Sequence, residues 1–343
     1  MADQEKTSPP GHATPAETDI WSSYWRGPRL VCSLAGPGIG YPQALVDVWR
    51  EFFGSLPSGA RLLDVATGNG AVAIMANDTA KSLKRRFEIH ASDQADINPS
   101  IHLRGTELST DGIVFHARTP AERTGFPDAH FDVITGQFAL EYTDIAASVA
   151  EMGRILRPGG LARFILHMRD SGIYLQTRRQ LADIHLAIDE LQILRKAREM
   201  MRLAYAFENS GNSDAALLSD ARQAREAYMR AARVMDNTMP SVAYKELFIA
   251  ILQMVAYHWE HRAESPFEQF TSRMDEMQAE IALAEKRHAA MCDHALDTVQ
   301  IEELKVRFVK CGFAVPSVDK LEITMDGVTG CVGWDLLTRR AGP

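Results

Sequence analysis

The chain has 343 residues, enough for two domains or for one domain with a large insertion. Its composition, 46% hydrophobic and 24% charged residues, is that of a globular protein. The formal net charge of −8 argues against a nucleic-acid-binding surface, because phosphate contacts need clustered Lys and Arg. The four cysteines are scattered, without C-x-x-C or zinc spacing, which indicates reduced thiols in a cytoplasmic protein.

The N-terminal residues are polar and contain prolines, without the hydrophobic core of a signal peptide. We expect a disordered tail over 1–18 and a helical flap over 19–53. The flap begins with an aromatic group at helical spacing, Trp21, Tyr24 and Trp25. This group is either the docking face of a short amphipathic helix or a cover whose ring faces favour a bound cation.

Short apolar runs and helix-like segments alternate between residues 54 and 172, at a spacing that predicts βαβ units and a parallel sheet. A sheet-like pattern returns at 299–343. The strands that we expect are 61–66, 87–92, 112–117, 131–136, 161–167, 318–325 and 330–339. The two segments together predict one α/β domain with a doubly wound, mostly parallel seven-stranded sheet.

The intervening segment, 173–298, contains a single glycine, Gly211, and its pattern is helical. Apolar side chains recur on one helical face, at Leu181, Ile184, Ile188 and Leu191. We predict an all-helical insertion after strand five, acting as a lid with a substrate pocket or as a homodimer contact. Its longest apolar stretch, 247–257, is far shorter than a membrane span, so no membrane partner is expected.

A glycine turn links the first predicted strand to the helix that follows. Its residues fit the G-x-G-x-x-A spacing, with Gly68, Gly70 and Ala73. Such a turn lets a ligand approach the backbone at a helix N-terminus, and enzymes that use NAD and enzymes that use S-adenosylmethionine (SAM) both contain it. By itself the turn does not separate the two cofactors.

Two acidic residues flank this turn. Asp64 precedes it, and Asp93 follows the next strand, 25 residues after Gly68, where an acid accepts hydrogen bonds from ribose hydroxyls. Alternatives stay open at both positions. Asp64 could cap a turn, and Asp93 could be a solvated loop acid with Asp96 as the ribose ligand.

The glycine turn, its flanking acids and two later segments together resemble the class I, Rossmann-like SAM-dependent methyltransferases, in the branch of quinone-biosynthesis and small-molecule enzymes. Four ordered segments carry the resemblance: DVATGNG (64–70), Asp93, FPDAHFDVITGQFAL (126–140) and RILRPGGLARF (154–164). The turn at 311–313 with the strand pair after it also fits. Ala66 stands where the family's loop has its first glycine.

The resemblance implies SAM as the cofactor and S-adenosylhomocysteine (SAH) as its product. It assigns the methionine end of SAM to Asp64, Ala66, Thr67, Gly68 and Gly70. Asp93 would hold the ribose, and Gln137 would line the methionine or substrate side. The family's usual Gly-Asp at the adenine contact is replaced by Thr119-Pro120, so adenine recognition falls to Ala121 or Glu122.

Candidate catalytic residues lie where predicted strands four and five end. A general base is needed only when the nucleophile arrives protonated. Glu141 and Tyr142 follow strand four, and His167 ends strand five. His167 could instead be structural, and Tyr142 could pack against the cofactor. No metal site is expected, because His258 and His261 lack the spacing of a zinc helix.

These features predict a methyltransferase that transfers a methyl group by in-line displacement to O, N or C of a small apolar or aromatic metabolite. The partner would be that small molecule rather than nucleic acid. Two alternatives are a non-catalytic SAM-binding regulatory protein and a protein methyltransferase that recognises its partner through the helical insertion. A nicotinamide oxidoreductase is a more remote alternative, because the position of Asp64 ahead of the glycine turn argues against it.

Overall fold

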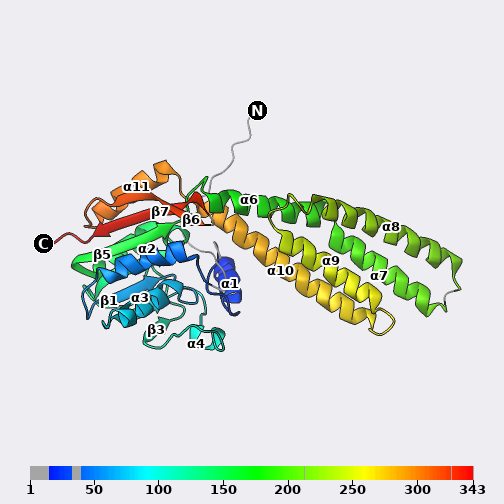
Figure 1. Cartoon of the computed structure of the whole chain (residues 1–343), viewed down its shortest axis with the longest axis horizontal. Helices are drawn as coiled ribbons and strands as arrows, with labels where there is room; N and C mark the ends of the chain where they lie inside the picture. Colours follow the sequence, from blue (N-terminus) through cyan, green and yellow to red (C-terminus); the bar gives the residue numbers. More distant parts are fainter. Residues whose placement is uncertain (1–14, 33–39, 212, 326, 343) are drawn as a thin grey trace. The chain divides into compact units, whose positions relative to one another are not determined.

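The structure is a computed structural model, and it describes residues 15–32, 40–211, 213–325 and 327–342 (Figure 1). Residues 1–14 of the expected tail lie outside these ranges. Helix α1 (Pro15–Tyr24) begins inside the expected tail, so the expected boundary at residue 18 is too late. No helix in the described ranges is both long and apolar enough to span a bilayer.

The chain divides into two compact units. The first, called the sheet unit here, comprises Met1–Tyr174 and Asp293–Pro343, and the second, the helical unit, comprises Leu175–Cys292. The large helical region after strand five is therefore confirmed. Its bounds lie a few residues inside the predicted 173–298, and its last helix continues to His294 in the sheet unit.

The sheet unit contains the predicted seven strands: β1 (Arg61–Val65), β2 (Glu88–Ser92), β3 (Ile113–His116), β4 (Phe131–Gln137), β5 (Leu156–Leu166), β6 (Ser317–Met325) and β7 (Val328–Arg339). Their order across the sheet is β3-β2-β1-β4-β5-β7-β6. Strands β1 to β5 pair in parallel, whereas β7 runs antiparallel to both β5 and β6. The mostly parallel α/β sheet is confirmed, with an antiparallel pair at one edge.

Strand β5 begins earlier than the predicted residue 161. Phe131 pairs with Leu156, and the next pair joins Val133 to Leu161, so the residues between them form a bulge. Gly159 in this bulge has a φ of +79°, a left-handed conformation that glycine adopts at little cost. Residues 156–160, which precede the predicted strand, thus belong to β5.

Helices cover both faces of the sheet (Figure 1). They are α2 (Gln43–Gly54), α3 (Ala71–Ser82), α4 (Pro99–His102), α5 (Ile145–Ile155) and α11 (Thr298–Lys310), with a 3₁₀ turn, η1, at Leu140–Tyr142. Apolar residues of α5 and α11, among them Met152 and Phe308, form one core with β-strand residues such as Phe164. On the opposite face, the Arg163 guanidinium lies over the ring of Trp49 in α2.

The helical unit has a hydrophobic core of its own. Its elements are α6 (Gly172–His185), which starts in the sheet unit, the π-helix η2 (Leu186–Glu190), α7 (Ile193–Asn209), α8 (Ala215–Thr238), α9 (Lys245–Glu260) and α10 (Phe267–His294). Met274, Met277 and Ile281 of α10 are buried in this core with residues of α7 and α9. These side chains therefore pack in the core of the helical unit. A homodimer contact elsewhere on this unit stays a prediction.

Candidate active site

The predicted glycine turn lies between β1 and α3, at the carboxyl edge of the sheet. Ala66, Gly68 and Gly70 all have positive φ, at 49°, 56° and 89°. A Cβ at Gly68 would lie 2.5 Å from the indole of Trp25, and one at Gly70 would lie 2.8 Å from the ring of Phe115. Both glycines are thus required by the backbone conformation and by the available space.

Asp64 is buried at the end of β1, where it joins three segments. Its Oδ1 accepts a hydrogen bond of 2.9 Å from the Thr135 hydroxyl of β4, and the Thr67 hydroxyl of the turn donates to Oδ2. Burial raises the pKa of Asp64 to about 7, although both hydroxyl hydrogen bonds act to lower it. Asp64 therefore holds the shape of the turn, and its contact with the methionine end of SAM stays a prediction.

Asp93 lies directly beside the turn. Its Oδ2 accepts from the backbone N–H of Gly68 and its Oδ1 from that of Ala95, both at 2.7 Å. Burial raises the pKa of Asp93 to about 6, against the effect of these two hydrogen bonds. Asp93 is only 7% exposed, so the solvated-loop interpretation is wrong. Asp96 is the exposed acid, and it forms an ion pair of 2.9 Å with Arg118.

The aromatic residues Trp21 and Tyr24 of α1 and Trp25 directly after it form a segment that packs onto the turn. The Nδ2 of Asn69 donates to the carbonyl oxygens of Trp25, Gly27 and Arg29, at 2.8–3.2 Å. Trp25 is buried, and its cluster includes Ala95, which follows β2. The segment therefore lies where the sequence places the cofactor, and the expectation that it covers SAM becomes part of the proposal below.

The other two aromatic residues of the segment have different surroundings. Trp21 stacks on Trp25 at a centroid distance of 6.2 Å and meets the edge of Tyr142 at 5.8 Å. The Tyr24 hydroxyl donates to the carbonyl of Val31, so this side chain folds back on its own segment. Trp21 thus connects the glycine turn to the predicted catalytic residues.

Gln137, the last residue of β4, and the predicted adenine residues fall in different places. Gln137 accepts a hydrogen bond from the indole N–H of Trp49. Ala121 packs in the core between the sheet and the helices α5 and α11. The Glu122 carboxylate accepts from the backbone N–H of Asp144, the N-cap of α5. The structure thus brings neither Ala121 nor Glu122 to the glycine turn, and their contact with adenine stays a prediction.

Glu141 and His167 meet where β4 and β5 end. The Oε1 of Glu141 accepts from the backbone N–H of His167 at 2.7 Å, and its Oε2 has no hydrogen-bond partner among the described residues. Burial raises the pKa of Glu141 to about 7, although the hydrogen bond from the His167 N–H acts to lower it. Glu141 is only 3% exposed, so this unpartnered oxygen needs an explanation.

His167 is the second unpartnered polar group here. Its ring stacks on Phe138 at a centroid distance of 4.1 Å, and neither ring nitrogen has a partner within the part of the chain that the structure describes. Burial, and secondly the nearby His294, lower the pKa of His167 to about 3. At neutral pH the imidazole is therefore uncharged, and one nitrogen can donate a hydrogen bond while the other accepts one.

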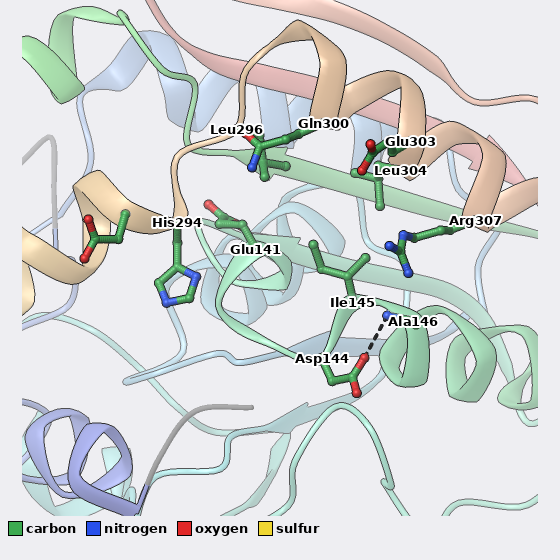
Figure 2. Close-up of a pocket in the computed structure, with 11 residues that line it drawn as sticks. Glu141, Asp144, Ile145, Ala146, His294, Leu296, Gln300, Glu303, Leu304 and Arg307 are labelled. Carbon is green, nitrogen blue, oxygen red and sulfur yellow. Dashed lines mark hydrogen bonds between the residues drawn. The ribbon is translucent and has the colours of Figure 1, made fainter. Parts of the chain in front are cut away.

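A pocket opens beside Glu141 (Figure 2). Its lining includes Asp144 and Ile145 at the start of α5, Leu296, and His294 at the end of α10. The His294 and Tyr142 ring centroids lie 4.9 Å apart. Sequence reasoning missed His294. The only available signal was its place in the last helical turn before the chain re-enters the sheet unit.

Part of the sheet unit is similar in sequence to known proteins. Residues 63–164 match the family model described as a methyltransferase domain. The Ubiquinone/menaquinone biosynthesis C-methyltransferase UbiE of Shewanella halifaxensis is 37% identical over 122 residues, or 33% of this chain and 46% of the relative. The same enzyme from Psychromonas ingrahamii is 34% identical over 121 residues, with the same coverage. The chain thus spans about half the length of these curated relatives.

Among solved structures, a SAM-dependent methyltransferase of Thermotoga maritima, described as a possible histamine N-methyltransferase, is similar at 11% identity and a TM-score of 0.38. The similarity covers 87% of this chain and 89% of that one. Residues 63–164 of the sheet unit are thus similar to a methyltransferase domain, and about a third of the chain is similar to methyltransferases of quinone biosynthesis.

Proposed function

We propose that the protein is an enzyme that transfers the methyl group of SAM to a small molecule. The observation that carries this proposal is the junction of the glycine turn with Asp93. Gly68 and Gly70 hold the turn in its left-handed backbone conformation, and the hydrogen bond from Gly68 N–H holds the Asp93 carboxylate beside it. Open α/β sheets bind ligands at this carboxyl edge of their strands.

The domain's residues suit the needs of methyl transfer. The sulfonium of SAM supplies an already activated methyl group, so the protein has mainly to position the acceptor and exclude water. The backbone of 66–70 would hold the methionine end of SAM, and Asp93 would hold the ribose. Trp21 and Trp25 would exclude water, and their ring faces favour a cation.

The unpartnered atoms of Glu141 and His167 support an acceptor that arrives carrying a proton. With a pKa near 7, the Glu141 carboxyl is suited to take that proton at neutral pH. The neutral His167 imidazole would form a hydrogen bond with the acceptor, and its contact with Phe138 places an aromatic face nearby. A phenolic or quinol ring meets these demands, and the relatives' names point to the same class of substrate.

Binding of the methyl donor is the first test. Calorimetry with SAM and SAH should show one site on the wild-type chain. Asp93→Ala should weaken both ligands at least tenfold, about 1.4 kcal/mol. Asp96→Ala is the matched control, because Asp96 lies three residues further on and is exposed, and it should change neither affinity appreciably. Thermal unfolding of Asp93→Asn, which retains an acceptor oxygen for Gly68, separates lost binding from a disrupted turn.

Two results would contradict the proposal. One is a folded wild-type chain that binds neither ligand, and the other is equal affinity in Asp93→Ala and Asp96→Ala. Binding of SAM without SAH formation across phenolic acceptors would favour a SAM-binding regulatory protein instead. A cytoplasmic location remains part of the proposal.

A further inference from the structure

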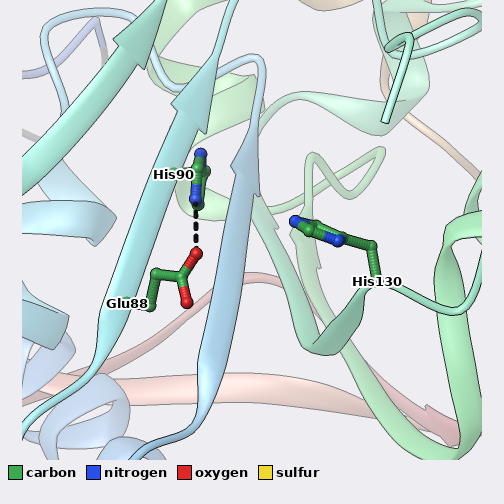
Figure 3. A group of neighbouring side chains, drawn as sticks. All are labelled: Glu88, His90 and His130. Carbon is green, nitrogen blue, oxygen red and sulfur yellow. Dashed lines mark hydrogen bonds and ion pairs between the residues drawn. The ribbon is translucent and has the colours of Figure 1, made fainter. Parts of the chain in front are cut away.

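A second group of polar side chains lies on one face of the sheet, away from the glycine turn. Glu88 and His90 alternate along β2 and therefore point to the same face. His130, just before β4, faces them (Figure 3). One potential ligand atom from each of the three residues lies within 4.8 Å of the other two. Two imidazoles and a carboxylate are a donor set that zinc accepts.

The surroundings of His90 favour metal binding. Its Nδ1 lies 2.9 Å from the Nε2 of His116, and its Nε2 lies 3.2 Å from the Glu88 carboxylate. Histidines that bind metals commonly donate their other ring N–H to a neighbouring group, which fixes the tautomer. When His90 donates its Nδ1–H to His116, two acceptors face each other across 3.2 Å, and a cation between them satisfies both.

Glu88 and His130 already contact a positive charge, the guanidinium of Arg61. The Nε of Arg61 lies 2.9 Å from Glu88, and its Nη1 lies 3.3 Å from the Nδ1 of His130. The Arg61 side chain is 36% exposed, so the guanidinium can move into solvent. A metal ion would have to displace it, and Arg61 therefore acts as a competitor that reduces the affinity of the site.

We propose that Glu88, His90 and His130 form a binding site for a divalent transition metal of the zinc type, held by nitrogen and oxygen ligands. Such an ion would connect β2 to the segment before β4, with water in the fourth position. Glu88 begins β2 whereas Asp93 follows its end, so the site is separate from the glycine turn. The inference does not depend on the proposed methyl transfer.

Titration of the full chain with Zn²⁺ alone tests the site. Calorimetry should show one saturable site, weakened at least tenfold by His90→Ala and by His130→Ala. Arg61→Met should tighten binding about tenfold, the equivalent of about 1.4 kcal/mol. His185→Ala is the matched control, because His185 at the end of α6 and Asp189 in η2 form an exposed histidine–carboxylate pair. This variant should bind as the wild type does.

Co²⁺ provides an independent spectroscopic check, since the chain also has four cysteines whose thiolates could bind a metal. The proposed site predicts visible bands of a nitrogen- and oxygen-ligated ion, without the near-ultraviolet charge-transfer band of a thiolate. Variants that fail to fold would be detected by circular dichroism, and Arg61→Met tests the site without removing a ligand. Absence of saturable Zn²⁺ binding, equal affinity in His90→Ala and His185→Ala, or a thiolate band would each overturn the proposal.

Discussion

The buried carboxyl of Glu141 allows a prediction whose size follows from the structure. Burial raises its pKa from an ordinary 4.5 to about 7, so the folded state keeps a proton that the unfolded chain loses between these values. The free energy of unfolding must therefore fall as pH rises through this window. Each pH unit is worth about 1.4 kcal/mol, so the wild type loses up to about 3 kcal/mol by pH 8.

Glu141→Gln removes this charge and keeps a carbonyl oxygen for the backbone N–H of His167. At pH 5 the variant and the wild type should have similar stability. At pH 8 the variant should be more stable by about 1–3 kcal/mol, because it does not bury an anion. Urea denaturation at both pH values measures the difference, and Glu303→Gln, an exposed carboxyl lining the same pocket, is the control. A stability difference that is the same at pH 5 and pH 8 would refute this reasoning.

Three further predictions concern the glycine turn and the sheet. Gly68→Ala should lower the free energy of unfolding in urea denaturation by more than about 1–3 kcal/mol, because its Cβ would add a clash with Trp25 to the backbone strain. Gly59→Ala is the control, since Gly59 has a φ of +88° and no atom near its Cβ position, and this variant should show the backbone strain alone. Trp25→Ala should weaken binding of SAM more than binding of SAH, which lacks the sulfonium charge, by about 0.5–1 kcal/mol in calorimetry, if its ring faces the sulfonium. Asp335→Ala should cost about 3–5 kcal/mol in urea denaturation, because it leaves the largely buried Arg163 guanidinium without its carboxylate, and a loss below 1 kcal/mol would contradict this.

Features with local sequence signals were predictable. The glycine turn and Asp93 follow from residue types at fixed spacing, and the strand pattern predicted the seven strands. The start of β5 was not predictable, because the bulge at Gly159 depends on pairing with β4. Likewise, the packing of Trp25 on Gly68 joins residues that are far apart in the sequence, and periodicity carries no signal for such a contact.

The sequence analysis did not predict contacts between residues that are far apart along the chain. His294 is far from Glu141 in the sequence and reaches the pocket because the chain returns to the sheet unit after the helical insertion. The group of Glu88, His90 and His130 depends on strand alternation and sheet order together. Sequence reasoning considered only His258 and His261 as a metal pair, and the structure places His258 in contact with the Phe270 ring.

A crystal structure of the chain with SAH would test the proposed methyl-donor site most directly. We predict SAH against the backbone of 66–70, with its ribose hydroxyls on the Asp93 carboxylate and Trp25 moved or repacked around it. SAH bound elsewhere on the sheet unit, or bound with Asp93 still joined only to Gly68 and Ala95, would contradict the proposed cofactor site.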